Sequence, residues 1–180
     1  IATGESNTGH IDNKKNTALI YACDSILQEV ALALIATGES NPGQVNDARN
    51  TALIMACIMK MTDVALALIT TGRSNPGHTN NHGETALMIA CSNEMSEVAL
   101  ALIATGESDP GHADNYEHTS LLVACDNVNY TALMYACKLK MTDVALALIA
   151  TGESNPGHAN NVNYTALMFA CKRNMTDVAL

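Results

Sequence analysis

The sequence predicts an all-α solenoid, in which a helix–turn–helix unit is repeated and stacked along the chain. Three observations predict this fold. The triplet Thr-Ala-Leu, or Thr-Ser-Leu in one copy, recurs at a spacing of 34 residues, with one interval of 12. Each triplet opens an apolar run with helical periodicity. Most copies end in a polar loop rich in Gly, Pro and Asn. A period near 34 residues is typical of stacked helical repeats that share one core.

Residues 1–180 are expected to form a single repeat array. Residues 1–16 read as a partial repeat, made of the end of a second helix and its loop. The later repeats start near six threonines: Thr17, Thr51, Thr85, Thr119, Thr131 and Thr165. The repeat at Thr119 is truncated, and the repeat at Thr165 is partial.

The first full repeat shows how each pair of helices is expected to form. Thr17 suits an N-cap position, and Leu19 and Cys23 follow it on one helical face. The second helix is expected near 27–37, with Gly38 as its left-handed stop. In later copies a Thr followed by Asp is expected to cap this second helix, at Thr62, Thr142 and Thr176.

The loop that follows contains a Pro-Gly pair, first at Pro42–Gly43, which predicts a type II turn. Paired Asn and Asp residues close each loop and are expected to form side-chain turns on their own backbone. These pairs are Asp12–Asn13, Asn46–Asp47, Asn80–Asn81, Asp114–Asn115, Asp126–Asn127 and Asn160–Asn161.

Charge and composition exclude several classes of partner. The net charge of -9 opposes binding to nucleic acid or to an anionic membrane surface. Apolar runs such as residues 30–36 are far shorter than the roughly 20 residues that span a bilayer. Residues 1–10 lack the basic start and apolar core of a signal peptide.

The six cysteines occupy one repeated position, six residues after each Thr: Cys23, Cys57, Cys91, Cys125, Cys137 and Cys171. Equivalent points on stacked helices lie about 8–10 Å apart, whereas a disulfide requires Cα atoms within about 7 Å. We therefore expect reduced, buried thiols and an intracellular, reducing compartment, the cytoplasm of a cell or host.

These features resemble the ankyrin repeat family. The residues from Gly83 to Asp109, GETALMIACSNEMSEVALALIATGESD, resemble the family pattern G-x-T-P-L-H-x-A-A followed by a second helix and a polar turn. The resemblance covers essentially the whole chain. It implies a curved stack of antiparallel helix pairs, whose inner helix face and hairpin tips bind other proteins. The 34-residue period and the TGESNPGH loops are similar to ankyrin arrays of large DNA viruses, so a viral origin is one expectation.

The chain departs from the family pattern in three respects. The usual His is replaced by an apolar residue, namely Ile20, Ile54, Met88, Leu122, Met134 and Met168. The usual Pro is Ala or Ser, and the loop is one residue longer than the family norm. The interval of 12 between Thr119 and Thr131 lacks 22 of the 34 residues. Two explanations are possible: a second helix and its loop are deleted, or part of the natural sequence is absent here. We favour the second explanation. A chain break near 125–128 would support it, and an unbroken chain would refute it.

No residue pattern predicts an enzyme, and no cofactor or metal site is expected. His10, His78, His112 and His158 share one loop position that Gln44 holds in the remaining copy. Two zinc-bound imidazoles would each lie about 2 Å from the metal, whereas successive repeats are about 8–10 Å apart. We expect these histidines to be structural or exposed.

The positions that vary between copies predict a surface that binds a partner protein, although drift at solvated positions would give the same variation. Tyrosines are favoured there because they are frequent hot spots of interfaces. The candidate partner-binding residues are Lys14, Arg49, His82, Tyr116, Tyr130, Tyr164, Lys60, Lys140 and Arg173.

The second helices carry leucines where charged residues are expected in the family: Leu32, Leu66, Leu100 and Leu146. If these side chains face outward, they form an apolar stripe that marks an interface. Two functions follow. The first is a non-enzymatic scaffold that binds a partner protein through the inner helices and hairpin tips. The alternative is a self-assembling structural protein that forms fibres through the leucines and the uncapped ends.

Overall fold

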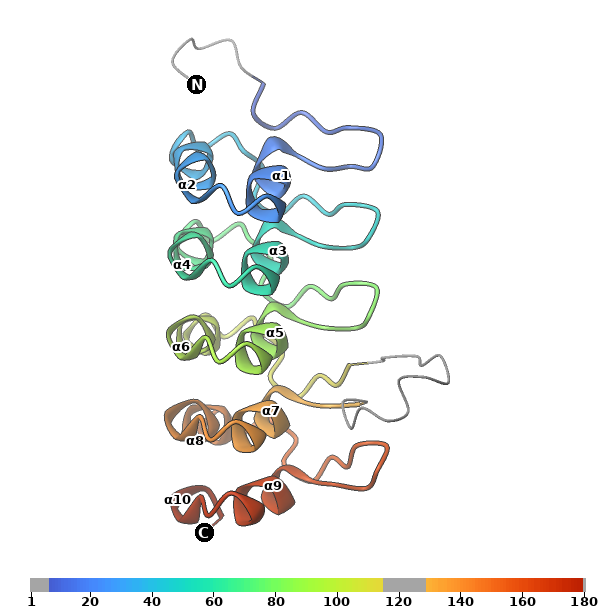
Figure 1. The fold of residues 1–180 in the computed structure, drawn as a ribbon, viewed down its shortest axis with the longest axis vertical. Coiled ribbons are helices and arrows are strands. Elements are labelled where there is room, and N and C mark those ends of the chain that lie inside the picture. The colour runs from blue at the N-terminus through green and yellow to red at the C-terminus, as the bar shows by residue number, and fades with distance from the viewer. Residues whose placement is uncertain (1–6, 115–128, 180) are drawn as a thin grey trace.

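A computed structural model describes residues 7–114 and 129–179 of the chain. Figure 1 shows its helices as two parallel columns, with hairpin loops projecting from one side. We call the column next to the hairpins the inner helices: α1 (Ala18–Asp24), α3 (Ala52–Ile58), α5 (Ala86–Ser92), α7 (Ala132–Lys138) and α9 (Ala166–Lys172). The outer helices are α2 (Gln28–Ala36), α4 (Thr62–Thr70), α6 (Ser96–Ala104), α8 (Thr142–Ala150) and α10 (Thr176–Ala179). The predicted all-α solenoid is confirmed.

Each inner helix starts at the predicted threonine cap. The Thr17 Oγ1 accepts a hydrogen bond from the Ile20 N–H at 3.2 Å. The same bond recurs at Thr51, Thr85, Thr131 and Thr165. A cap of this kind contributes about 1 kcal/mol. Capping therefore fixes the start of every inner helix in the same register.

The prediction that Thr62 and Thr142 cap outer helices is wrong. The caps are Met61 and Met141, neither of which makes a side-chain capping bond, and each Thr is the first helical residue. The reason is burial: Met61 is 3% exposed, and its N–H donates to the Ala56 carbonyl at 2.9 Å. The outer helix therefore begins where its first apolar side chain enters the core.

The core runs continuously between the two columns. Helices α1, α3, α5 and α7 bury the position where the family carries His, and Ile54, Met88 and Met134 are at most 1% exposed there, whereas Met168 of α9 is 48% exposed. The outer helices contribute a Val-Ala pair and a Leu one turn later, such as Val98 and Leu102, both 0% exposed. Inner helices of seven residues are too short to be stable alone. Their stability comes from packing on the neighbouring repeats.

The Pro-Gly turns differ from the predicted type II geometry. Gln44 N–H donates to the Asn41 carbonyl at 3.1 Å, which closes a turn around Pro42 and Gly43. However, the positive φ of 48° belongs to Asn41, and Gly43 is outside the left-handed region. A type II turn requires a positive φ at the glycine. Gly43 is instead needed for space, because a Cβ there would lie 2.8 Å from the Arg73 carbonyl oxygen of the next repeat.

The Asn and Asp side-chain turns are present in the described loops. The Asn80 Oδ1 accepts from the N–H groups of His82 at 2.9 Å and Glu84 at 3.0 Å. Asn160 does the same toward Val162 and Tyr164. These bonds hold the two strands of each hairpin together at its base, so the hairpins project from the stack at a defined angle.

The stack is continuous across the irregular interval. Helix α7 packs directly on α5, and α8 packs on α6. Asp114 N–H donates to the Tyr130 carbonyl at 3.1 Å, which is the bond that joins Asn80 to Glu84 one repeat earlier. The irregular interval therefore places 12 more residues between the two bonded positions, Asp114 and Tyr130, than a regular hairpin has between its own. The helix expected at Thr119, and the expected break near 125–128, lie outside the described residues.

Candidate protein-binding groove

The variable positions form columns along the inner helices. Because the inner helices stack in register, their last residues follow one another from repeat to repeat. These residues are Asp24, Ile58, Ser92, Lys138 and Lys172. The packing residues beneath them are nearly constant, so side chains of different chemistry are presented from one fixed scaffold.

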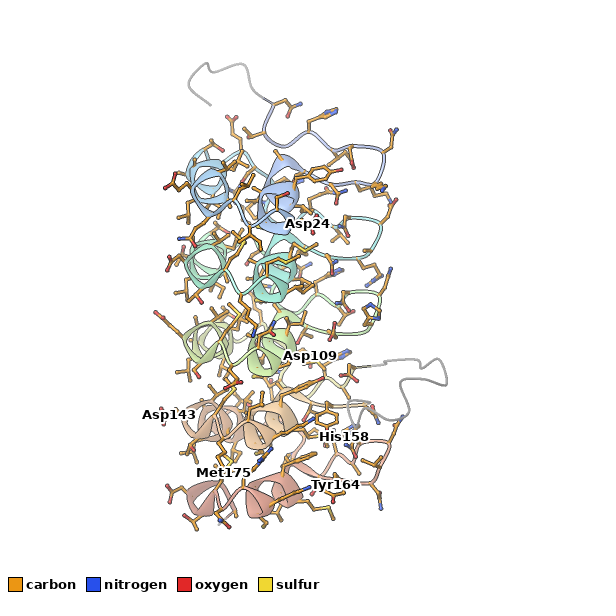
Figure 2. The ribbon with its side chains drawn as sticks, in the orientation of Figure 1. Asp24, Asp109, Asp143, His158, Tyr164 and Met175 are labelled. Carbon is orange, nitrogen blue, oxygen red and sulfur yellow. The ribbon has the colours of Figure 1, made fainter. Side chains whose placement is uncertain are left out.

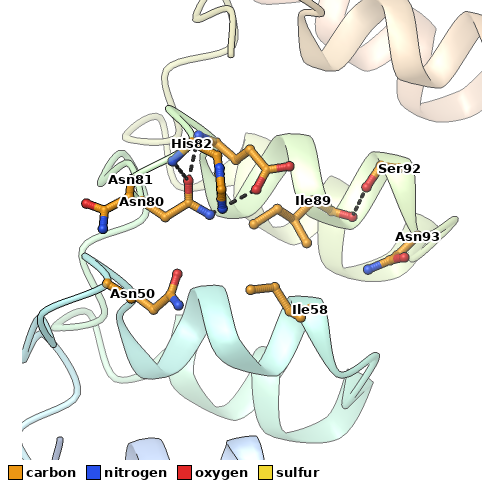
Figure 3. Close-up of a pocket in the computed structure, with 10 residues that line it drawn as sticks. Asn50, Ile58, Asn80, Asn81, His82, Ile89, Ser92 and Asn93 are labelled. Atoms are coloured by element: carbon orange, nitrogen blue, oxygen red, sulfur yellow. Dashed lines mark hydrogen bonds between the residues drawn. The ribbon is translucent and has the colours of Figure 1, made fainter. Parts of the chain in front are cut away.

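A pocket of about 540 Å³ lies where α3 and α5 meet two hairpins. Figure 3 shows Ile58 from α3 facing Ile89 and Ser92 from α5, with Asn50 and Asn80 from the hairpin bases beside them. The lining residues are Ala48, Asn50, Ile58, Asn80, Asn81, His82, Glu84, Ile89, Ser92 and Asn93. The floor is apolar and the rim carries amide, imidazole and carboxylate groups, a combination typical of binding pockets.

Hydrogen bonds between residues of the wall hold this pocket in shape. The Asn80 Nδ2 donates to the Glu84 Oε2 at 2.9 Å. The Asn93 Nδ2 donates to the carbonyl of Cys57 in the preceding inner helix at 3.0 Å. The Cys57 carbonyl also accepts from the Lys60 N–H at 3.2 Å, so the Asn93 bond is an additional one that ties two repeats together. The polar rim is thus oriented before any partner arrives.

Most of the predicted partner-binding residues lie on the surface. Lys14, Arg49, His82, Lys60, Lys140 and Arg173 are exposed, and Tyr164 is 37% exposed. His82 lines the pocket, whereas Arg49 Nε donates to the Thr79 carbonyl of the next hairpin at 3.3 Å. Tyr116 lies outside the described residues.

Tyr130 is not a surface residue, and its prediction as a contact for a partner is corrected by the structure. Its side chain is 0% exposed. Its ring centroid lies 4.9 Å from that of Tyr135 and 5.5 Å from that of Phe169, and the Lys138 Nζ lies 5.0 Å from its centre. The earlier repeats carry Asn50 and Glu84 at this position. The aromatic ring instead fills the space between α7 and α9.

The loop histidines join neighbouring repeats, a role that sequence reasoning missed. The Nε2 atoms of His78, His112 and His158 lie 3.0, 2.8 and 3.0 Å from carbonyl oxygens of the preceding hairpin. A carbonyl can only accept, so Nε2 carries the hydrogen. Gln44 donates its Nε2 to the Lys15 carbonyl in the same way, at 3.4 Å. Burial lowers the pKa of His78 below its usual value.

The described cysteines are all free, and all but Cys171 are buried. Burial raises the pKa of the Cys23 and Cys57 thiols to about 12. A thiol with so high a pKa is a poor nucleophile at neutral pH. Within residues 7–114 and 129–179, no group of three His, Cys, Asp or Glu side chains is placed to hold a metal ion. In the same residues, no helix is long and apolar enough to cross a membrane.

The outer leucines are only partly accessible. Leu100 and Leu146 are 38% and 39% exposed, whereas Leu32 and Leu66 are half-buried and pack against the core. The four leucines therefore expose less apolar surface than the sequence suggested. At the end of the stack, Leu167 and Met168 are 52% and 48% exposed and line a hollow of about 600 Å³.

Ile89 and Asn80 are lining residues that the sequence did not single out. The signal for Ile89 was present in the variation within the inner helices, since the equivalent residues are Tyr21, Met55, Tyr135 and Phe169. Asn80 gave no such signal, because every hairpin base carries Asn or Asp.

Comparison with known proteins agrees with this architecture. A family model described as ankyrin repeats (3 copies) matches residues 24–114 and 60–151. The crystal structure of EF0377, an ankyrin repeat protein, superposes with a TM-score of 0.70 at 20% sequence identity, over 97% of this chain and 83% of that one. A search of curated proteins found no match. Ankyrin repeats are generally non-enzymatic modules for protein–protein interaction. The family match extends over more than half of the residues, so the chain belongs to the ankyrin repeat family.

Proposed function

We propose that this chain is a non-enzymatic scaffold that binds a partner protein through the groove formed by its inner helices and hairpins. The observation that carries the proposal is the pocket between α3 and α5. Its walls differ from those of the other repeats, whereas the packing residues beneath are repeated. A preorganised wall reduces the conformational entropy lost on binding.

Site-specific photo-crosslinking tests this function. A benzoylphenylalanine is placed at Ser92 in the groove or, as the matched control, at Thr70 on the exposed face of α4. We expect a defined crosslinked protein from Ser92 and none from Thr70 in extract of the cells in which the protein is made. Ile58→Glu should abolish that crosslink; because Ile58 is only 37% exposed, the melting temperature of the variant is measured as well, which separates a lost contact from lost stability. Equal labelling from both positions would overturn the proposal.

Self-association is the second candidate, and the exposed parts of Leu100 and Leu146 favour it. These leucines lie on successive outer helices, α6 and α8, which pack on each other. Together they offer one apolar surface to a second copy. Sedimentation of the wild type should show a dimer or larger assembly that Leu100→Glu with Leu146→Glu converts to a monomer. A monomeric wild type would end this candidate.

The free thiols also support the proposal of a reducing compartment in a cell or host. Thiol labelling after denaturation tests it: protein taken from its native source should carry every cysteine in the reduced form. A mixed disulfide found there would contradict this placement.

A further inference from the structure

Charged side chains are unevenly distributed along the inner-helix column. Its first inner helix ends in Asp24, whereas its last two end in Lys138 and Lys172. Figure 2 shows Asp24 beside α1 and Tyr164 beside α9, at opposite ends of the column. The turns that follow α7 and α9 add Lys140 and Arg173. We call these four residues, Lys138, Lys140, Lys172 and Arg173, the cationic end of the groove.

Negative charges near the cationic end lie on other parts of the repeat. Asp143 and Asp177 are in the first turns of α8 and α10, where they interact with the helix dipole. Glu153 lies in the loop after α8. Among the described residues, no carboxylate lies within ion-pair distance of Lys140, Lys172 or Arg173. The four cations lie at or just after the ends of α7 and α9, two helices that pack on each other, in a chain whose net charge is -9.

Aromatic rings accompany these cations. The Lys138 Nζ lies 5.0 Å from the centre of the Tyr130 ring, and the Lys172 Nζ lies 5.6 Å from that of Tyr164. The attraction between an ammonium group and the ring face restrains both lysines. Tyr164 is 37% exposed. The surface therefore combines positioned positive charge with an accessible aromatic ring.

The α3–α5 part of the groove has a different chemistry. Its pocket is lined by asparagines and by Glu84, and Glu94 follows α5 in the turn where Lys140 follows α7. The turn after α3 carries Lys60, so charges of both signs lie beside this pocket, whereas the cationic end carries four cations and attracts a partner's carboxylates. This polarity fixes where the negative part of a bound segment must lie.

We propose that the cationic end binds an acidic segment of a partner protein, in which Asp or Glu residues alternate with apolar ones. The carboxylates pair with Lys138, Lys140, Lys172 and Arg173, and an apolar side chain packs against Tyr164. This inference rests on the proposed scaffold function and adds the chemistry of the partner and its direction along the groove.

Fluorescence anisotropy with a labelled synthetic peptide tests the proposal. The probe is a short peptide of Glu, Leu and Gly, and the matched peptide carries Lys in place of every Glu. We expect the Glu peptide to bind, the Lys peptide not to bind, and the affinity of the Glu peptide to fall as salt is added. Lys140→Glu with Arg173→Glu should weaken binding by about tenfold or more. Both side chains are exposed, and Glu94 already occupies the position equivalent to Lys140.

The control variant makes the same change in net charge elsewhere. Lys15→Glu with Arg73→Glu alters the first hairpin, where Lys15 forms an exposed ion pair with Asp47, and a loop position where other repeats carry Glu39, Glu107 and Glu153. It should bind the Glu peptide like the wild type, apart from a weak long-range effect. If Lys140→Glu with Arg173→Glu lowers the melting temperature, Lys138→Ser with Lys172→Ser replaces it, since Ser92 occupies the equivalent position.

Three results would overturn the proposal: no binding of the Glu peptide, equal loss in both charge variants, or tighter binding of a short oligouridylate than of the Glu peptide. If any of these occurs while Ser92 still crosslinks a partner, only the acidic chemistry is wrong and the scaffold function stands. Loss of the crosslink itself would refute the scaffold function.

Discussion

At the scale of single residues, the loop glycines are constrained by space between repeats. A Cβ at Gly77 would lie 2.6 Å from the Glu107 carbonyl oxygen of the next repeat, whereas a Cβ at Gly157 would meet no atom within 4 Å. Neither glycine has a positive φ. The two positions carry the same residue in nearly the same local sequence. A comparison of the same substitution at both positions therefore measures the contribution of the contact between repeats.

We predict that Gly77→Ala destabilises the protein by about 1–2 kcal/mol, because the neighbouring backbone must move away from the new methyl group. Gly157→Ala should be neutral or stabilising by about 0.5 kcal/mol, since Ala restricts the unfolded chain. Urea unfolding followed by circular dichroism measures both. Equal destabilisation by the two variants would contradict the close approach at Gly77.

The turns between the helices of each pair contain a residue with positive φ. In the first pair this residue is Ile26, with a φ of 57° and 61% exposure. The left-handed conformation costs about 1–2 kcal/mol for an ordinary residue, and Asn tolerates it better. The equivalent Asn174 adopts the same φ of 57°.

We therefore predict that Ile26→Asn stabilises the protein by about 1 kcal/mol. Lys60→Asn, at the equivalent turn with a φ of 55°, should give a smaller gain because Lys is not β-branched. Thermal unfolding compares the two variants with the wild type. A lower melting temperature for Ile26→Asn would show that apolar contacts of Ile26 stabilise the protein by more than the left-handed backbone conformation costs.

The histidine bonds predict a dependence of stability on pH. Burial lowers the pKa of His78 in the folded protein relative to the unfolded chain. The folded state thus binds fewer protons near pH 6 than the unfolded chain does. The stability that neutral His78 contributes is therefore fully present above the unfolded pKa of about 6.5, and it is lost as the pH falls through the lower pKa of the folded state. His78→Gln should keep the bond to the preceding hairpin, as Gln44 does, and lose part of this dependence. Urea unfolding at pH 8 and pH 5 measures the difference; identical pH dependence in both proteins would contradict it.

At the scale of elements, each inner helix is capped by its own repeat but stabilised by the next one. The cap and the side-chain turn lie within the same repeat, such as Thr131 with Met134 or Asn160 with Tyr164. The aromatic packing instead joins elements: Tyr130 precedes α7, and its ring contacts Phe169 of α9. A substitution there affects the interface between two repeats.

Tyr130→Ala is predicted to cost about 3 kcal/mol, as expected when a fully buried aromatic side chain is removed. Tyr164→Ala removes the equivalent, partly exposed ring and should cost less than about 1 kcal/mol. Denaturant unfolding measures both, and hydrogen exchange should show the loss of protection concentrated in α7 to α10. A cost for Tyr130→Ala as small as that for Tyr164→Ala would place the Tyr130 ring outside the core.

At the scale of the whole molecule, the described helices pack as one continuous stack despite the irregular spacing of the repeats. The residues that flank the irregular interval, Asp114 and Tyr130, form the bond found at every other described hairpin base. Removal of residues 117–128 would leave Asn115, Tyr116 and Asn129 between them. The resulting sequence DNYNYT closely matches the regular hairpin NNVNYT at 160–165.

We predict that deletion of residues 117–128 preserves the helical circular dichroism spectrum and raises stability by about 1 kcal/mol or less, because a shorter connection between Asp114 and Tyr130 costs less entropy to close. The control removes the same number of residues at 83–94, which includes α5, and should abolish cooperative unfolding. Loss of helicity in the first variant would show that residues 117–128 contribute to the core.

The sequence by itself determined the repeat, its helix pairs, the threonine caps of the inner helices and the side-chain turns at Asn80 and its equivalents. These depend on residues a few positions apart, so the pattern within one repeat is sufficient to predict them. It also indicated most of the exposed variable residues, among them His82 and Arg173.

Only the tertiary structure decided which of these side chains a neighbouring repeat covers. Tyr130 and Tyr164 have the same local sequence, yet one is buried and the other is 37% exposed, because α9 packs over the first. The tight approach at Gly77, the histidine bonds and the pocket at Ile89 likewise arise between repeats. Local patterns specify backbone conformation, whereas burial depends on atoms some 30 residues away along the chain, as the separation of 29 residues between His78 and Arg49 illustrates.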